Sequence, residues 1–88
     1  MNKDKSYSEI IKGYYFGILK DYEKGEKYSI LVDKLLEELF PFYQFEYGDF
    51  DIVVLYSKTA SLKYLNYKTL RKVILKDCMT LVDKIFKV

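Results

Sequence analysis

Two aspartates, Asp49 and Asp51, come closest in this sequence to a catalytic pattern. They are separated by one residue and precede the apolar run 52–55. Two carboxylates in front of a buried strand can together hold a divalent metal ion. The same residues also fit the start of a helix at Phe50, with Asp49 as N-cap and Asp51 in the first turn, where negative charge is favoured. We favour the helix cap.

The other groups that enzymes commonly use are missing. The sequence has no histidine, which is the commonest general base near neutral pH. Its one cysteine, Cys78, cannot form a structural zinc site. The glycines match no phosphate-binding loop, and no serine lies in a GxSxG motif. The Gly-Ser turn that accompanies the Asp-x-Asp pair of nucleotidyltransferases is absent. We therefore expect no catalytic residues, no metal, no cofactor and no enzymatic activity.

Charge is distributed unevenly along the chain. Residues 1–57 contain seven lysines and eleven acids, a net charge of −4. Residues 58–88 contain seven lysines, one arginine and two aspartates, a net charge of +6. The acidic part has a cluster in mid-chain, which consists of Asp33, Glu37, Glu38, Glu46, Asp49 and Asp51. Such an asymmetry bears on partners and orientation and not on the fold.

The basic residues must be positioned by the stretch 67–86, which contains neither Gly nor Pro. Its apolar residues recur every three or four positions, a spacing that places side chains on one face of a helix. Asn66 precedes the stretch and is a good N-cap. Cys78 is on the apolar face, so we predict a buried and unreactive thiol. The cations are on the other face, which is either a solvated surface or a basic docking surface.

Two further helices are predicted upstream. Residues 6–23 have the most regular helical spacing of apolar residues, and Gly13 and Gly17 within them suggest a close approach to another helix. A second helix should begin near Ser29. Pro41 should kink or end it, because proline lacks an amide donor and its ring clashes with the preceding turn.

Residues 42–56 are compatible with two structures. A β-hairpin about Gly48 and Asp49 would use their aromatic and β-branched side chains, but it would place Glu46 opposite Asp51. A third helix starting at Phe50 avoids this repulsion, and helices are predicted on both sides. We favour the helix. One domain, residues 1–88, is then an all-α antiparallel up-and-down four-helix bundle, and the alternative is an α+β fold with a hairpin at 42–56.

The order of these features resembles the enterocin A-type (pediocin-like) bacteriocin immunity proteins, over residues 9–82. The resemblance consists of Ile11, Tyr15 and Ile18 in the first helix, KYSIL at 27–31, the apolar segment 52–60, and KYLNY at 63–67 leading into Leu70 and Leu75. It implies a four-helix bundle without enzymatic activity that protects the producing cell from its own bacteriocin. Such proteins act at the inner face of the membrane sugar-uptake receptor that the bacteriocin subverts, where they block the pore.

The resemblance also indicates where a partner binds. Partner choice in the family is associated with the C-terminal half, which here is the +6 segment. We therefore expect five cations to contact the bacteriocin–receptor complex, with peripheral contact to the anionic inner leaflet. These cations are Lys63, Lys68, Arg71, Lys72 and Lys76.

The expected location is the cytoplasm, in part at the membrane. The N-terminal residues are polar and charged, so we expect no signal peptide. The longest uncharged runs, 13–19 and 39–45, have seven residues each, whereas a membrane span needs about 20.

Two other functions remain open. The chain could be a small inhibitor or interaction module, such as a phage-encoded antagonist, that binds through its acidic cluster. It could also be a nucleic-acid-binding helical domain with residues 66–87 as its recognition helix. We disfavour nucleic acid, because that helix lacks the Gln, Asn and Arg mixture that reads base edges and the sequence pI is only about 8.5. The sequence leaves the oligomeric state open.

Overall fold

The computed structural model describes residues 3–23, 28–45 and 50–86. Helix α1 covers Lys3–Glu23, α2 covers Ser29–Phe45 and α3 covers Phe50–Ser61. A 3₁₀ turn, Leu62–Tyr64, follows α3. The last part of the chain consists of α4 (Tyr67–Lys72), the π-helical segment η2 (Val73–Cys78) and α5 (Met79–Ile85). We call these last three together the C-terminal helix.

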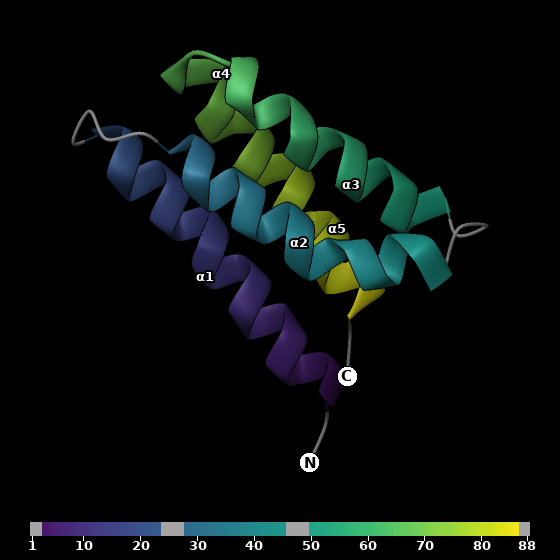
Figure 1. Cartoon of the computed structure of the whole chain (residues 1–88). Coiled ribbons are helices and arrows are strands. Elements are labelled where there is room, and N and C mark those ends of the chain that lie inside the picture. Colours follow the sequence, from purple (N-terminus) through teal and green to yellow (C-terminus); the bar gives the residue numbers. More distant parts are fainter. Residues whose placement is uncertain (1–2, 24–27, 46–49, 87–88) are drawn as a thin grey trace.

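Successive helices run in opposite directions, so that the start of α1 and the end of α5 lie at the same end of the bundle (Figure 1). Helix α2 packs between α1 and α3, and the C-terminal helix contacts α1 and α3 from the other side. The predicted all-α four-helix bundle is confirmed. Residues 42–45 belong to α2 and residues 50–56 to α3, so the alternative with a hairpin at 42–56 is wrong. The predicted N-cap Asp49 lies outside the described residues.

The core follows the predicted helical spacing. Each helix contributes residues three or four positions apart, and their side chains pack into one cluster between the four helices. Its fully buried members include Ile11, Tyr15, Ile18, Val32, Leu35, Leu39, Ile52, Leu55, Leu62, Leu70, Ile74, Cys78 and Val82. Burying apolar surface is the main favourable term in folding, so this cluster fixes how the helices lie against one another.

Of the two outcomes predicted for Pro41, a kink or an end of the helix, the end is wrong, because α2 continues through Pro41. Phe42, the next residue, packs edge-on against Tyr7 of α1 at 4.9 Å and against Phe86 at 5.0 Å between ring centroids. Pro41 itself is exposed. Pro41 has no amide to donate to the backbone carbonyl of Glu37, a residue that is itself exposed. Tertiary packing of Phe42 therefore outweighs the unfavourable helix propensity of proline.

Neither glycine of α1 is required by a tight helix contact, contrary to the predicted close approach. A Cβ at Gly13 would meet no atom within 4 Å, and one at Gly17 would lie 3.5 Å from Leu31 Cδ1, an ordinary contact.

We expect Gly13→Ala to stabilise the protein by about 0.5–1 kcal/mol, because alanine restricts the unfolded chain and favours the helix. Chemical denaturation of both proteins measures this difference, and a lower stability of the variant would contradict the exposed position of Gly13.

The C-terminal helix departs from the predicted uninterrupted α-helix. The buried residues of this helix, together with Phe86 directly after it, are spaced by four: Leu70, Ile74, Cys78, Val82 and Phe86. At 3.6 residues per turn, each four-residue step rotates a side chain by about 40° beyond a full turn, or about 160° over the series. In η2 the amide of Met79 donates to the carbonyl of Ile74, which makes a wider turn. This turn takes up part of the rotation and keeps the later residues on the buried side.

Candidate functional site

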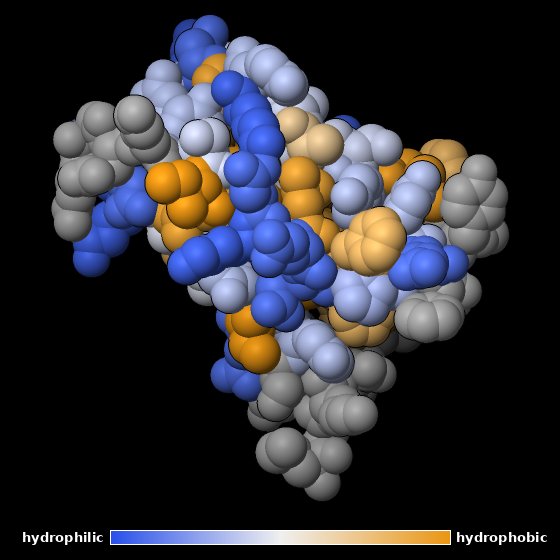
Figure 2. All heavy atoms as spheres, in the orientation of Figure 1, coloured by the Kyte–Doolittle hydropathy of each residue, from blue (hydrophilic) through white to orange (hydrophobic). Residues whose placement is uncertain are grey.

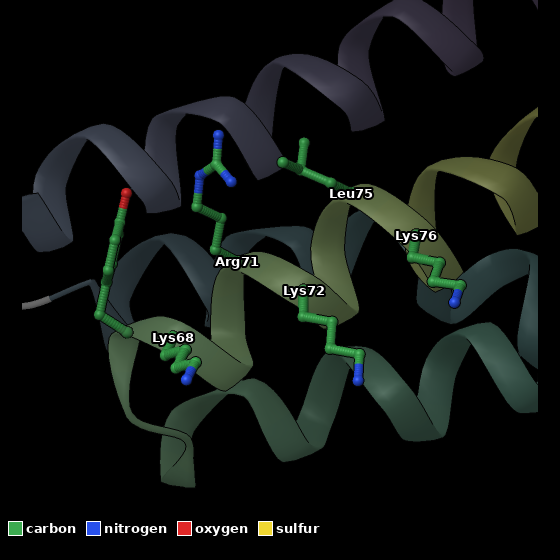
Figure 3. A pocket seen from close by; sticks show the side chains of 6 residues that line it. Lys68, Arg71, Lys72, Leu75 and Lys76 are labelled. Carbon is green, nitrogen blue, oxygen red and sulfur yellow. The ribbon is translucent and has the colours of Figure 1, made fainter.

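A hollow on the C-terminal helix contains most of the predicted partner-binding cations. It has a volume of about 560 Å³, and we call it the basic groove (Figure 3). It is lined by Tyr67, Lys68, Arg71, Lys72, Leu75 and Lys76. The helix that supports it begins as predicted, because the side chain of Asn66 accepts a hydrogen bond from the amide of Thr69 at 3.0 Å.

The groove residues point in two directions (Figure 3). Arg71 and Leu75 point toward α1, whereas Lys68, Lys72 and Lys76 point toward the side of α3. The three lysines are four residues apart, so they form a row along one side of the helix. All four cations are exposed, and Leu75 is 39% exposed. The groove therefore presents a row of ammonium groups beside an apolar side chain.

Four of the five predicted cations are brought together, and Lys63 is not among them. Lys63 lies in the 3₁₀ turn and forms a salt bridge with Asp33 of α2. The hydrogen bond to Asp33 raises the pKa of the Lys63 ammonium above its ordinary value. Its charge is therefore compensated within the bundle, away from the basic groove.

Ion pairs elsewhere in the bundle leave the basic groove uncompensated. The other described lysines of the +6 segment each pair with an aspartate, and so does one lysine of α1. These pairs are Lys58–Asp77 at 3.4 Å, Lys84–Asp51 at 3.2 Å, Lys63–Asp33 and Lys12–Asp83. Both aspartates of residues 58–86 are thus engaged outside the groove. Within the described ranges, Lys68, Lys72 and Lys76 have no ion-pair partner, so positive potential is concentrated on this face.

Tyrosine side chains pack and form hydrogen bonds at the N-terminal end of the basic groove. The hydroxyl of Tyr67 donates to Glu23 Oε1 at 2.7 Å, and its ring stacks on Tyr22 at 5.3 Å between centroids. The bond to Glu23 and burial raise the pKa of Tyr67, while the neighbouring Arg71 lowers it. Tyr28 packs against Tyr22 and donates to the Lys63 carbonyl at 3.1 Å. These contacts connect the start of α4 and the 3₁₀ turn before it to the end of α1 and the start of α2.

Two lining residues, Tyr67 and Leu75, were not among the predicted site residues. Tyr67 was assigned to the apolar face, where its ring does lie half-buried. Leu75 is one position past the buried residue Ile74 and four past Arg71. A helical projection that includes this offset places Leu75 beside the cations, so the signal was present in the sequence.

The acidic cluster does not form one free surface in the described part of the chain. Asp33 and Asp51 form salt bridges with Lys63 and Lys84. On α2, Glu37 is exposed and Glu38 is half-buried. Glu46 and Asp49 lie outside the described residues. Among the residues with a described structure, no three His, Cys, Asp or Glu side chains are placed to hold a metal ion.

The predicted burial of Cys78 is confirmed, since its side chain is fully buried. Burial raises the pKa of the thiol from its ordinary value of 9.0 to about 11, and a hydrogen bond with Tyr15 lowers it by a smaller amount. The Tyr15 hydroxyl also lies 2.6 Å from Thr59 Oγ1, and the Thr59 hydroxyl donates to the Leu55 carbonyl at 2.7 Å. The thiol is thus part of a small polar cluster inside the core.

We expect Cys78 to resist thiol reagents in the folded protein at about pH 8. With a pKa of about 11, only roughly one thiol in a thousand is ionised there, and the sulfur is buried. Because the folded pKa lies above the ordinary value, this group stabilises the fold fully below about pH 9 and loses that contribution as pH rises toward 11. A labelling time course with and without denaturant tests this, and fast labelling of the folded protein would contradict it.

The shape of the basic groove favours a macromolecular partner. All six lining residues belong to one stretch of helix, Tyr67 to Lys76, so the groove has one wall and stays open. Small-molecule sites enclose most of the ligand surface, which requires walls from several elements. On the face formed by α1, α2 and α3, hydrophobic residues are interspersed with hydrophilic ones (Figure 2). The basic groove, by contrast, has four cations on one stretch of helix.

Comparisons with protein-family models, curated proteins and solved structures gave no match for this chain. None of the described helices combines the length and the apolar character that crossing a membrane requires.

Proposed function

We propose that this protein is a non-catalytic binding protein that docks on an acidic partner through the basic groove. The observation that supports this is the segregation of charge, because Lys68, Lys72 and Lys76 share one face without an ion-pair partner in the described ranges. Interacting charges of opposite sign steer association and fix orientation. The partner chemistry that complements this groove is a row of carboxylates.

We further propose that the partner is a bacteriocin–receptor complex, as the resemblance to pediocin-like immunity proteins implies. The protein would work in the cytoplasm, in part at the membrane, and protect its producer by binding without catalysis. The basic groove belongs to the C-terminal half, the part that the resemblance associates with partner choice. The charge pattern and the resemblance are independent arguments for the same surface.

The other functions have less support. An acidic docking face would use the acidic cluster, but Asp33 of α2 and Asp51 of α3 are already paired with lysines. Of its other described members, Glu37 is exposed and Glu38 is half-buried. A nucleic-acid interface would use the same cations on phosphates. Leu75, which lines the groove, offers phosphates no hydrogen-bond donor. The lining residues also include no Asn or Gln to read base edges.

Association with membranes of a bacteriocin-sensitive strain should require the bacteriocin. We expect the purified protein to sediment with such membranes only after bacteriocin treatment, and to be released as ionic strength rises from about 0.1 to 1 M, because the Debye length falls from about 10 to about 3 Å. Sedimentation followed by immunoblotting measures this. Equal binding with and without bacteriocin would contradict the proposed partner, and salt-sensitive retention on heparin alone would favour nucleic acid.

A further inference from the structure

A second hollow lies between α3 and α5 and adjoins the basic groove. Its volume is about 240 Å³. It is lined by Val54, Lys58, Lys76, Asp77, Thr80 and Leu81. Lys76 lines both hollows, so they are neighbours along the C-terminal helix. We call the second hollow the apolar socket.

The apolar socket has apolar walls and a polar rim. Val54 of α3 and Leu81 of α5 are half-buried. At the rim Lys58 and Asp77 form their salt bridge at 3.4 Å, and the Thr80 hydroxyl donates to the Lys76 carbonyl at 2.7 Å. The rim groups therefore already have partners. Small-molecule pockets are commonly about 300–1,000 Å³, so this smaller hollow suits one side chain better than a free metabolite.

The row of lysines ends at the apolar socket. Lys68, Lys72 and Lys76 point to the α3 side (Figure 3), which is the side on which the socket opens. Thr80, at the socket rim, continues the same four-residue spacing. At about 1.5 Å of rise per residue, each step is about 6 Å, so the three lysines extend over about 12 Å and Thr80 lies about 6 Å further along. A helical segment with carboxylates four residues apart has the same repeat.

We propose that the basic groove and the apolar socket form one docking site for an acidic helical protein segment. The carboxylates of that segment pair with Lys68, Lys72 and Lys76, and one apolar side chain enters between Val54 and Leu81. This inference rests on the proposed function, because it specifies the acidic partner. Charges give the register, and the apolar anchor supplies the desolvated contact from which binding energy mainly comes.

The half-buried position of the two apolar lining residues distinguishes this occupant from a lipid surface. A protein that lies on an anionic leaflet inserts protruding apolar side chains between the head groups. Val54 and Leu81 instead line a hollow and are half-buried. A hollow next to a row of cations fits a partner that itself protrudes.

A synthetic peptide tests the inference directly. The probe is a helical peptide that has three glutamates four residues apart and a leucine after the last glutamate. The control peptide is identical except that alanine replaces the leucine. Amide chemical shifts of the full chain would be followed by NMR, which detects weak binding. We expect the probe to shift amides along Lys68–Leu81 and at Val54. The control peptide should bind about tenfold more weakly and lose the shifts at Val54 and Leu81.

Protein variants separate charge from shape. Lys72→Glu should weaken probe binding by about tenfold or more, whereas Lys34→Glu, an exposed charge reversal on α2, should change it less than about twofold. Equal affinity of the two peptides, or no shift with either, would overturn the apolar anchor. If the protection of cells still depended on Lys72, the proposed function would stand without the apolar anchor. Shifts of the same amides by phosphatidylserine vesicles and not by the probe would overturn the inference in favour of a lipid surface.

Discussion

Replacing Arg71 and Lys72 together by glutamate should abolish partner binding without unfolding the protein. Both side chains are exposed and line the basic groove. The two substitutions turn attraction toward an acidic partner into repulsion at adjacent positions. Removing one member of a hydrogen-bonded charge pair that is buried in an interface costs about 2–5 kcal/mol, so we expect affinity to fall by roughly a hundredfold or more if the partner covers these cations. Cells that express the variant should therefore be killed at bacteriocin concentrations that the wild-type protein resists.

A matched variant separates this effect from a general change in charge. Lys20→Glu together with Lys34→Glu changes the net charge by the same amount on exposed positions of α1 and α2. That variant should retain affinity and protection. Thermal unfolding of both variants should show little loss, because surface substitutions usually change stability by less than about 0.5 kcal/mol each. Full protection by a folded Arg71/Lys72 variant would show that the groove does not contact the partner.

Removing the side chain of Tyr15 should have the largest effect on stability. Tyr15 is fully buried in α1, its hydroxyl lies 2.6 Å from Thr59 of α3, and it neighbours Cys78 of the C-terminal helix. It therefore joins three helices at one point. Truncating a buried aromatic residue to alanine costs about 3–5 kcal/mol. The whole stability of a chain this long is roughly 4–13 kcal/mol, at about 0.05–0.15 kcal/mol per residue, so Tyr15→Ala should be partly unfolded.

Two control variants divide this loss into its parts. Tyr15→Phe keeps the ring, and the Thr59 hydroxyl retains the Leu55 carbonyl, so it should cost only about 1–2 kcal/mol. Tyr64→Ala removes a tyrosine that is 86% exposed and should change stability by less than about 0.5 kcal/mol. Urea denaturation monitored by circular dichroism measures all three. Similar losses for Tyr15→Ala and Tyr64→Ala would contradict the central position of Tyr15.

Helix periodicity was enough to predict the helical bundle, because the burial of amphipathic helix faces follows from residue spacing. It was not enough to predict every buried face, since Phe50 of α3 and Ile30 of α2 are exposed. The continuation of α2 past Pro41 could not be predicted, since local propensity carries no information about the packing of Phe42 on Tyr7 and Phe86. The π segment was also missed. The four-residue spacing of Leu70, Ile74 and Cys78 was visible in the sequence, but only the bundle shows that all three are buried together.

The cations of the candidate site that lie on one helix were predicted, and the features that depend on contacts between distant parts of the chain were not. Lys68, Arg71, Lys72 and Lys76 belong to one helix, and helical spacing alone places them together. Lys63 lies before the helix, so whether it joins them depends on which acid α2 brings near it. Pairing with Asp33 is a contact between distant parts of the chain. The apolar socket has the same origin, because its walls come from α3 and α5.

Survival of bacteriocin-sensitive cells that express this chain is the most direct test of the proposed function. The cells would be challenged with a panel of pediocin-like bacteriocins, and the amount of folded protein in them would be checked. We predict selective survival against one or a few members of the panel, and loss of that survival in the Arg71/Lys72 variant. Killing by every bacteriocin, with folded protein present in the cells, would contradict the proposal.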